Sequence, residues 1–260
     1  MEVGLFSMQD EVRLEYERGF VQLILQESCR RPVFIAVLSI LTAFAVLAGT
    51  SQAMASVSRN ATFAAVHGTP ANVSDVSLSD PAWQKALSVT GFYNLTTRIP
   101  APLNTTAYLM YDADNIYVAF HSEQASAPIH AAQTTNNVGF GQDDFVGVGL
   151  DPSGNGSQVY YFEATPRGVR YQQASESTRF DPPWQAYAQV TGTSWNAVLV
   201  IPLKVLRASG GHDWRFNFIR GVAGVGEHYT WSFDGVMQDG QPPNYPLFTD
   251  ARFWPALTNV

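Results

Sequence analysis

The stretch from Asp151 to Glu163 has some features of a calcium-binding loop. Side-chain oxygens alternate from Asp151 to Asn155, and Gly156 stands where a twelve-residue EF-hand loop makes its sharp turn. Such a loop needs a bidentate acid at its twelfth position, but Phe162 occupies that position and Glu163 comes one residue late. The flanking residues alternate as strands do. We therefore expect this segment to join two strands and to hold no metal.

Asp143 and Asp144 form a carboxylate pair of the kind that can perform acid–base catalysis. No second acid pair or histidine accompanies them in the sequence, so we expect no catalytic set and no enzyme activity. Instead, we expect one carboxylate to accept hydrogen bonds from neighbouring backbone amides. The oxygen-rich turn at residues 112–115 has the same explanation, because Asp and Asn bond their own backbone in turns.

The five histidines are scattered and show no metal-ligand spacing. Met110 and His121 could ligate haem if this were an electron-transfer domain, but the sequence offers no haem-pocket signature. A haem-binding electron-transfer domain is therefore the weakest of three alternatives for function. A net charge of −7 excludes the electrostatic pattern that nucleic-acid binding requires.

Residues 32–49 form an apolar run that follows Arg30 and Arg31 and precedes the sequence Ala53-Met54-Ala55, in which two small residues flank Met54. This pattern predicts a signal peptide with cleavage after Ala55, so that residues 1–55 are an N-terminal extension and signal. The alternative is an uncleaved anchor, the one route by which we expect membrane contact. Cys29 precedes the run, so the exported part can form no internal disulfide. Both interpretations place residues 56–260 outside the cytoplasm, in the periplasm or secreted.

Short runs with strand-like alternation follow one another from residue 105 onward and are separated by turn residues. The predicted strands are 105–111, 116–122, 145–150, 158–165, 168–172, 185–191, 194–201, 214–220 and 228–233. Residues 202–208, with Pro202 first, are the one segment predicted to be helical. The pattern is typical of an antiparallel β-sandwich. We predict that residues 56–260 form a single all-β domain.

Six segments resemble, in order and spacing, the family 9 carbohydrate-binding modules and related domains of exported bacterial proteins. They are DPAWQKA (80–86), YDADNIYVAF (111–120), DDFVGVGLDP (143–152), the strand that ends in PRG (166–168), SWNAVLVIPLKVLR (194–207) and WRFNFIR (214–220). The resemblance implies a jelly-roll-like sandwich that binds sugar-chain ends between aromatic rings. It also implies links to carbohydrate breakdown, since relatives occur attached to glycoside hydrolases, and it allows a structural calcium.

The strand FVGVGL places two glycines on one face, which indicates either a shallow trough or a close neighbour that fills it. Gly147 corresponds to an acidic residue that contacts sugar in the family, and Glu163 and Thr165 stand where the family has Arg and Asn. Val198 replaces the usual Glu. The resemblance therefore implies a conserved scaffold with altered polar contacts.

Aromatic residues in Gly-, Pro- and Asn-rich loops are the candidate stacking rings. Phe140 lies close to one family clamp position, Tyr245 and Phe248 lie near the other, and Trp184 is in a further loop. Glu163, Thr165 and Arg220 are the candidate polar contacts. The sequence thus predicts an exported, non-catalytic carbohydrate-binding domain. The main alternative is a periplasmic structural or protein-interaction domain on the same fold.

Overall fold

The computed structural model describes residues 61–139, 141–175, 179–207, 213–232 and 251–260. The predicted signal segment, its cleavage site at Ala55 and the predicted stacking residues Phe140, Tyr245 and Phe248 lie outside these residues. No helix in the described part is long and apolar enough to cross a membrane.

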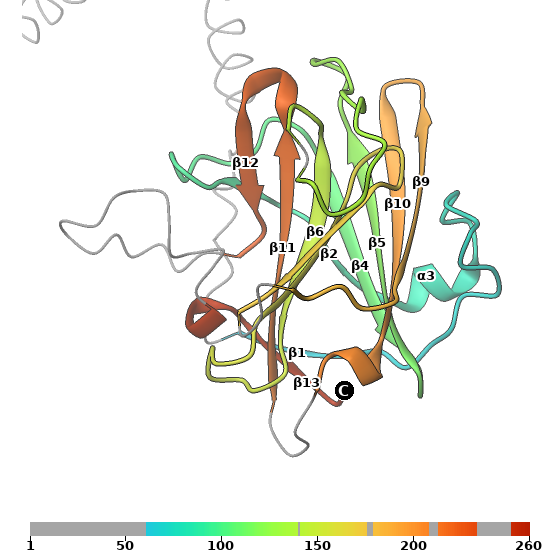
Figure 1. Cartoon of the computed structure of the whole chain (residues 1–260), viewed down its shortest axis with the longest axis vertical. Helices are drawn as coiled ribbons and strands as arrows, with labels where there is room; N and C mark the ends of the chain where they lie inside the picture. The colour runs from blue at the N-terminus through green and yellow to red at the C-terminus, as the bar shows by residue number, and fades with distance from the viewer. Residues whose placement is uncertain (1–60, 140, 176–178, 208–212, 233–250) are drawn as a thin grey trace, which may run out of the picture. The chain divides into compact units, whose positions relative to one another are not determined.

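Thirteen strands in the described residues form two sheets that pack face to face, with α3 on the outer side of the smaller sheet (Figure 1). The larger sheet has the order β1-β13-β11-β6-β7-β8, and β12 joins β11 to β3. Its strands are β1 (Thr62–Ala64), β3 (Tyr93–Asn94), β6 (Phe145–Asp151), β7 (Tyr160–Ala164), β8 (Arg170–Ala174), β11 (Trp214–Val222), β12 (Glu227–Thr230) and β13 (Ala256–Thr258). The protein is therefore an all-β sandwich, as predicted.

The smaller sheet has the order β2-β4-β5-β10-β9. Its strands are β2 (Leu87–Val89), β4 (Thr105–Tyr111), β5 (Asn115–Glu123), β9 (Gln185–Thr191) and β10 (Ser194–Pro202). The short helices are α3 (Pro81–Lys85), η2 (Leu203–Val205), η3 (Ala223–Val225) and η4 (Ala251–Phe253). Every pairing between these strands is antiparallel except that of β1 with β13.

The prediction of about one helical turn within residues 202–208 is confirmed. The structure forms a single 3₁₀ turn there, η2, with Pro202 as its extended N-cap residue. The α-helix of the described residues is α3, which begins with Pro81 and is capped by Asp80, whose carboxylate accepts a hydrogen bond from the amide of Ala82. Trp83 of α3 is buried against the outer face of the smaller sheet.

The main core lies between the sheets and follows the period-two alternation of the strands. In β6 the side chains of Val146, Val148 and Leu150 are fully buried in this core, together with Phe162 of β7 and Phe218 of β11. The intervening residues of β6, β7 and β11 therefore face outward. This alternation decides which predicted site residues share a surface.

Candidate functional site

The candidate site is the outer face of the larger sheet, around Glu163. The register pairs Gly147 with both Glu163 and Ile219, and it pairs Glu163 with Tyr171. Directly opposed residues of antiparallel strands project to the same face. Tyr171, Glu163, Gly147 and Ile219 therefore form one row across β8, β7, β6 and β11, on the side away from the core.

Gly147 allows the Glu163 side chain to lie flat on the sheet. A Cβ atom at Gly147 would collide with the Cγ of Glu163 and would stand 3.2 Å from the Cγ2 of Ile219. Glycine is thus required here by the close approach of a neighbouring side chain. At the position where the resemblance implies an acidic side chain, the space beside the backbone is instead occupied by the side chain of Glu163 from the next strand.

The predicted trough is largely filled at its two ends by aromatic rings. Trp254 packs on Gly149, where a Cβ would overlap its ring, and Phe145 packs on Gly221 in the same way. Trp254 itself is fully buried. The glycines of β6 are therefore explained mainly by close neighbours and not by an open trough. Glu163 lies between the two ends that these rings fill.

The Glu163 carboxyl group is crowded by protein atoms although part of the side chain stays accessible to solvent. Burial raises the pKa of Glu163 to about 8. Among the described residues, none donates a hydrogen bond to this carboxyl group. At neutral pH the group is therefore mainly protonated, so it offers one O–H donor and acceptor oxygens to a ligand.

Half-buried aromatic residues lie on the same face of the sheet as this carboxyl group. Tyr171 is its cross-strand neighbour, and Tyr161 precedes it by two residues on the same face of β7. Tyr161 makes an edge contact with Trp254 at 6.0 Å between ring centroids. At the other end, Phe145 makes an edge contact at 5.4 Å with the ring of His228. The face thus combines a protonated carboxyl group with partly exposed rings.

Thr165 lies on the same strand face as Glu163 but is fully buried. Its hydroxyl oxygen accepts hydrogen bonds from the amides of Arg167 and Val169, both at 3.3 Å. It therefore shapes the turn between β7 and β8. The structure does not present its hydroxyl beside the Glu163 carboxyl group as a second open polar contact.

Trp184 is buried at 3% exposure rather than displayed on a loop. Its indole N–H donates to the side-chain oxygen of Gln172 at 2.7 Å, and its ring makes an edge contact with Phe162 at 5.2 Å. The guanidinium of Arg170 lies over the ring at 5.5 Å. These contacts place Trp184 on the core side of the larger sheet, on the opposite face from Glu163.

Arg220 also points into the sandwich, because its position in β11 alternates with outward-facing Ile219. It is 1% exposed and donates to Thr105 Oγ1 at 2.7 Å, to Gln124 Oε1 at 2.9 Å and to the backbone carbonyl oxygens of Asn104 and Glu123. Burial lowers the pKa of Arg220 to about 10, which leaves it charged at neutral pH. It ties the two sheets together and does not share the outer face with Glu163.

The paired acids have the structural role that the sequence predicts. The Asp143 carboxylate accepts hydrogen bonds from the amides of Ala132 and Gln133, both at 2.7 Å. Asp144 is fully buried and accepts from the amides of His130 and Ala223. Both groups organise the loop that precedes β6.

The oxygen-rich loop after β6 connects β6 to β7. The Asp151 carboxylate accepts hydrogen bonds from the amides of Ser153 and Gly156, so it closes the turn. Within the described ranges, no three His, Cys, Asp or Glu side chains gather in a way that could hold a metal ion. At the other oxygen-rich turn, Asp112 accepts hydrogen bonds from the amides of Asp114 and Asn115 and from Tyr117.

The two residues considered as haem ligands are both engaged in the smaller sheet. Met110 is 1% exposed and lies against Gly68. It belongs to a second, smaller hydrophobic cluster between α3 and the smaller sheet, which also contains Trp83. The Nδ1 of His121 is 2.7 Å from the side-chain oxygen of Asn196. No described feature supports a haem site between them.

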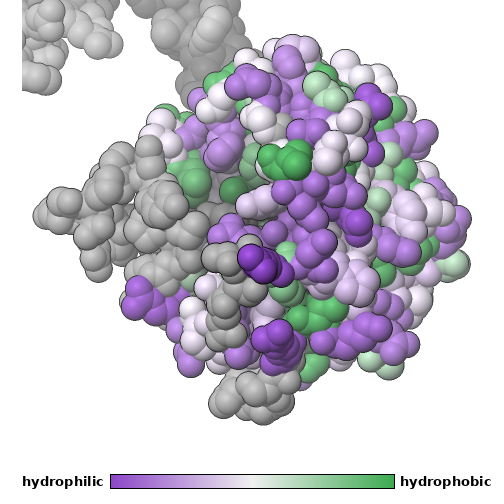
Figure 2. Space-filling view, viewed as in Figure 1, coloured by the Kyte–Doolittle hydropathy of each residue, from purple (hydrophilic) through white to green (hydrophobic). Residues whose placement is uncertain are grey.

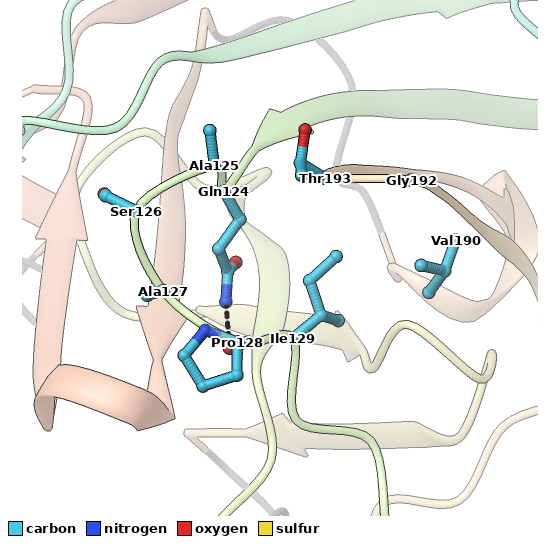
Figure 3. A pocket seen from close by; sticks show the side chains of 9 residues that line it. All are labelled: Gln124, Ala125, Ser126, Ala127, Pro128, Ile129, Val190, Gly192 and Thr193. Carbon is cyan, nitrogen blue, oxygen red and sulfur yellow. Dashed lines mark hydrogen bonds between the residues drawn. The ribbon is translucent and has the colours of Figure 1, made fainter.

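A separate hollow of about 570 Å³ lies between the loop after β5 and the β9–β10 hairpin (Figure 3). Its lining is mostly small side chains and backbone, and the Gln124 amide donates to the carbonyl of Pro128 across one wall. The described lining contains neither an aromatic ring nor a charged group. Its described lining therefore offers polar groups but no ring on which a sugar could stack.

No protein-family model matches this sequence, and no curated protein matches it. Solved structures do match. A candidate carbohydrate-binding protein from Bacteroides uniformis ATCC 8492 aligns with a TM-score of 0.58 and 16% identity, over 76% of this chain and 98% of the other. Two structures of a family 9 module from Caldicellulosiruptor kristjanssonii, with cellotriose and with glucose, align with TM-scores of 0.52. They are 13% and 14% identical and cover 76% of this chain and 94% and 96% of theirs.

This chain has the fold of the family 9 carbohydrate-binding modules. The resemblance inferred from six segments is therefore confirmed as a likeness of fold. On that fold the outer face of β6, β7 and β11 carries Gly147 and Glu163, two of the positions that the resemblance assigned to sugar contacts. Tyr171, His228 and Trp254 were not among the predicted site residues, because their place on this face depends on strand order. Period two along β6 places Phe145 on the same face as Gly147, but Phe145 was not predicted as a site residue either.

Proposed function

We propose that the chain is a non-catalytic carbohydrate-binding domain whose saccharide lies across the outer face of the larger sheet, around Glu163. The observation that carries the proposal is the Glu163 carboxyl group, which lies in a gap between aromatic rings and has no described hydrogen-bond donor. Solved structures of the same fold hold cellotriose and glucose, which supports a saccharide as the ligand.

The chemistry of this face suits a neutral sugar. A protonated carboxyl group donates one hydrogen bond and accepts others, which matches the paired donor and acceptor character of sugar hydroxyls. The partly exposed rings of Tyr171 and Tyr161 offer apolar surfaces for the C–H faces of a pyranose. Phe140, Tyr245 and Phe248 stay predicted stacking residues, outside the described residues.

The polar contacts differ from those that the resemblance implies for the family. Gly147 replaces an acid, and Glu163 replaces a permanently charged Arg with a group that is mainly neutral at pH 7. We therefore propose that the chain recognises a saccharide through fewer charged hydrogen bonds than its relatives. Ring stacking should then contribute a larger share of the affinity for the saccharide, and Glu163 should be the main polar contact.

We further propose that the domain acts outside the cytoplasm, in support of carbohydrate breakdown. The apolar run at residues 32–49 with its preceding Arg pair supports export. An exported binding domain would keep a polymer or oligosaccharide close to enzymes that degrade it. The absence of a catalytic set in the sequence is consistent with a role in binding rather than cleavage.

Affinity electrophoresis of the full chain in gels that contain neutral polysaccharides tests this function. Binding to at least one β-glucan or related polymer is expected. Glu163→Ala should weaken that binding about ten-fold or more, because it removes a buried hydrogen-bonding group from the ligand contact. Gln189→Ala is the matched control, since Gln189 is an exposed polar residue of β9, in the smaller sheet.

Unaltered migration of the wild-type chain in every saccharide gel would remove the basis for this function. Equal weakening by Glu163→Ala and Gln189→Ala would retain saccharide binding but would contradict its placement. Circular dichroism and thermal unfolding of both variants separate loss of binding from loss of fold.

A further inference from the structure

A basic pocket opens at the end of the sandwich where β7 begins and β8 ends. Its volume is about 360 Å³, within the range of small-ligand sites in proteins. One side is the cross-strand pair Tyr160 and Ala174, the second is the segment 179–182, and the third is η2 with the turn that follows it. Three separate parts of the chain thus converge on this pocket, away from the row that contains Glu163.

The floor of the basic pocket is apolar and fixed by the core. Tyr160 is 4% exposed, and its ring lies 5.3 Å from that of Phe180 at a tilt of 49°. Phe180 in turn makes an edge contact with Phe162 of the main core at 5.9 Å. Val205 also packs against the main core. Because these groups are anchored from behind, the pocket is preformed rather than a gap between mobile side chains.

The rim of the basic pocket carries three cations, Arg179, Lys204 and Arg207, all of them exposed. Residues 1–55 hold four of the fifteen basic residues and six of the twenty-two acidic ones, so the remaining chain has a net charge of −5. Three of its eleven basic residues surround one pocket. This concentration on an acidic domain favours an anionic ligand.

The one carboxylate in the lining is already satisfied by neutral donors. Asp181 Oδ1 accepts hydrogen bonds from the side-chain amides of Asn137 and Gln172, both at 2.9 Å. These bonds hold Asp181 toward the edge of the larger sheet. It therefore offsets only part of the positive charge of the rim.

We propose that the basic pocket binds the acidic group of an anionic saccharide, either a uronate carboxylate or a sulfate ester. The sugar ring would lie on the apolar floor, while Lys204 and Arg207 bind the anion. Guanidinium and ammonium groups recognise both oxyanions through charge-assisted hydrogen bonds. The saccharide part of this inference rests on the proposed function, whereas the anion preference rests on the pocket alone.

Binding of the full chain to polygalacturonate, dextran sulfate and neutral cellohexaose, measured by isothermal titration calorimetry, tests the proposal. We expect binding to at least one of the two polyanions, weakened when the salt concentration is raised to 0.5 M, because exposed charges are screened. The double variant Lys204→Gln/Arg207→Gln should lower affinity for that polyanion about ten-fold or more. The preferred polyanion identifies the acidic group as carboxylate or sulfate.

The variant Lys85→Gln is the matched control, because Lys85 is an exposed cation at the end of α3, on the outer side of the smaller sheet. It should leave all three affinities unchanged, and the double variant should leave cellohexaose binding unchanged. The proposal would be overturned if the chain bound cellohexaose but neither polyanion. It would also be overturned if the double variant and the control lost polyanion affinity equally. The proposed function would stand in both cases. Failure to bind any of the three would count against both.

Discussion

At the scale of single residues, Glu163 shows what strand periodicity can and cannot predict. Its place on the outer face follows from period two, since Phe162 and Ala164 on either side are buried in the core. Its raised pKa does not follow from any local pattern, because the burial that causes it depends on how neighbouring strands pack around it. Arg220 is a second example, because its hydrogen-bond partners, residues 104–105 and 123–124, lie about a hundred residues away in the sequence.

Replacement of Glu163 by Gln should make stability less dependent on pH. The carboxyl group has a pKa near 4.5 in the unfolded chain and about 8 in the folded one, so the folded state holds the proton between these values. Stability from this group is greatest below pH 4.5 and declines as pH rises to about 8. At pH 8 the free energy of unfolding of Glu163→Gln should therefore exceed that of the wild type by about 4 kcal/mol, with little difference at pH 4. Urea unfolding at both values measures this, and a constant difference would contradict it.

At the scale of elements, strands with clear alternation were predicted closely. The boundaries of β4 and β9 agree with the predicted ranges, and those of β5, β6, β10 and β11 differ by at most two residues. The short elements were missed, because β2, β3 and β13 have two or three residues each and exist through pairing with distant strands. A residue pattern of that length carries no period.

Gly149→Ala should show that the close approach of Trp254 holds the C-terminal segment on the sheet. An added methyl group would overlap the indole ring and should lower the free energy of unfolding by about 1–3 kcal/mol. Trp254→Ala removes a fully buried ring and should cost about 3–5 kcal/mol. Once the ring is absent, the extra methyl group has space. The double variant should therefore cost less than the two single changes combined, as denaturant unfolding would measure, and strict additivity would argue against this contact.

At the scale of the whole molecule, the fold class was predictable and the strand order was not. Short alternating runs indicated a sandwich, but β11 lies between β6 and β13, which only the long-range pairing establishes. The surface in Figure 2 mixes hydrophilic and hydrophobic side chains without a broad apolar area on the visible part of that face. The exposed large apolar residues are scattered single positions such as Ile99, Val190 and Val225.

Export can be tested on the whole chain by mass spectrometry of protein recovered from the cell envelope. Cleavage after Ala55 should yield an N-terminus at Ser56, because small residues at 53 and 55 flank Met54 as a signal peptidase site requires. The matched variant Ala53→Leu should slow this cleavage. An intact N-terminus with firm membrane association would show that residues 32–49 act as an anchor.

A nuclear magnetic resonance titration of the isotopically labelled full chain with cellotriose shows residue by residue whether the outer face around Glu163 binds a saccharide. The largest shift changes are expected at the amides of Gly147, Glu163 and Tyr171, which lie in one row of the larger sheet. The chemical shifts of the β9 amides, in the smaller sheet, should not change. Shift changes confined to another surface, or no shift changes with millimolar cellotriose and longer neutral oligosaccharides, would show that this face is not a saccharide-binding site.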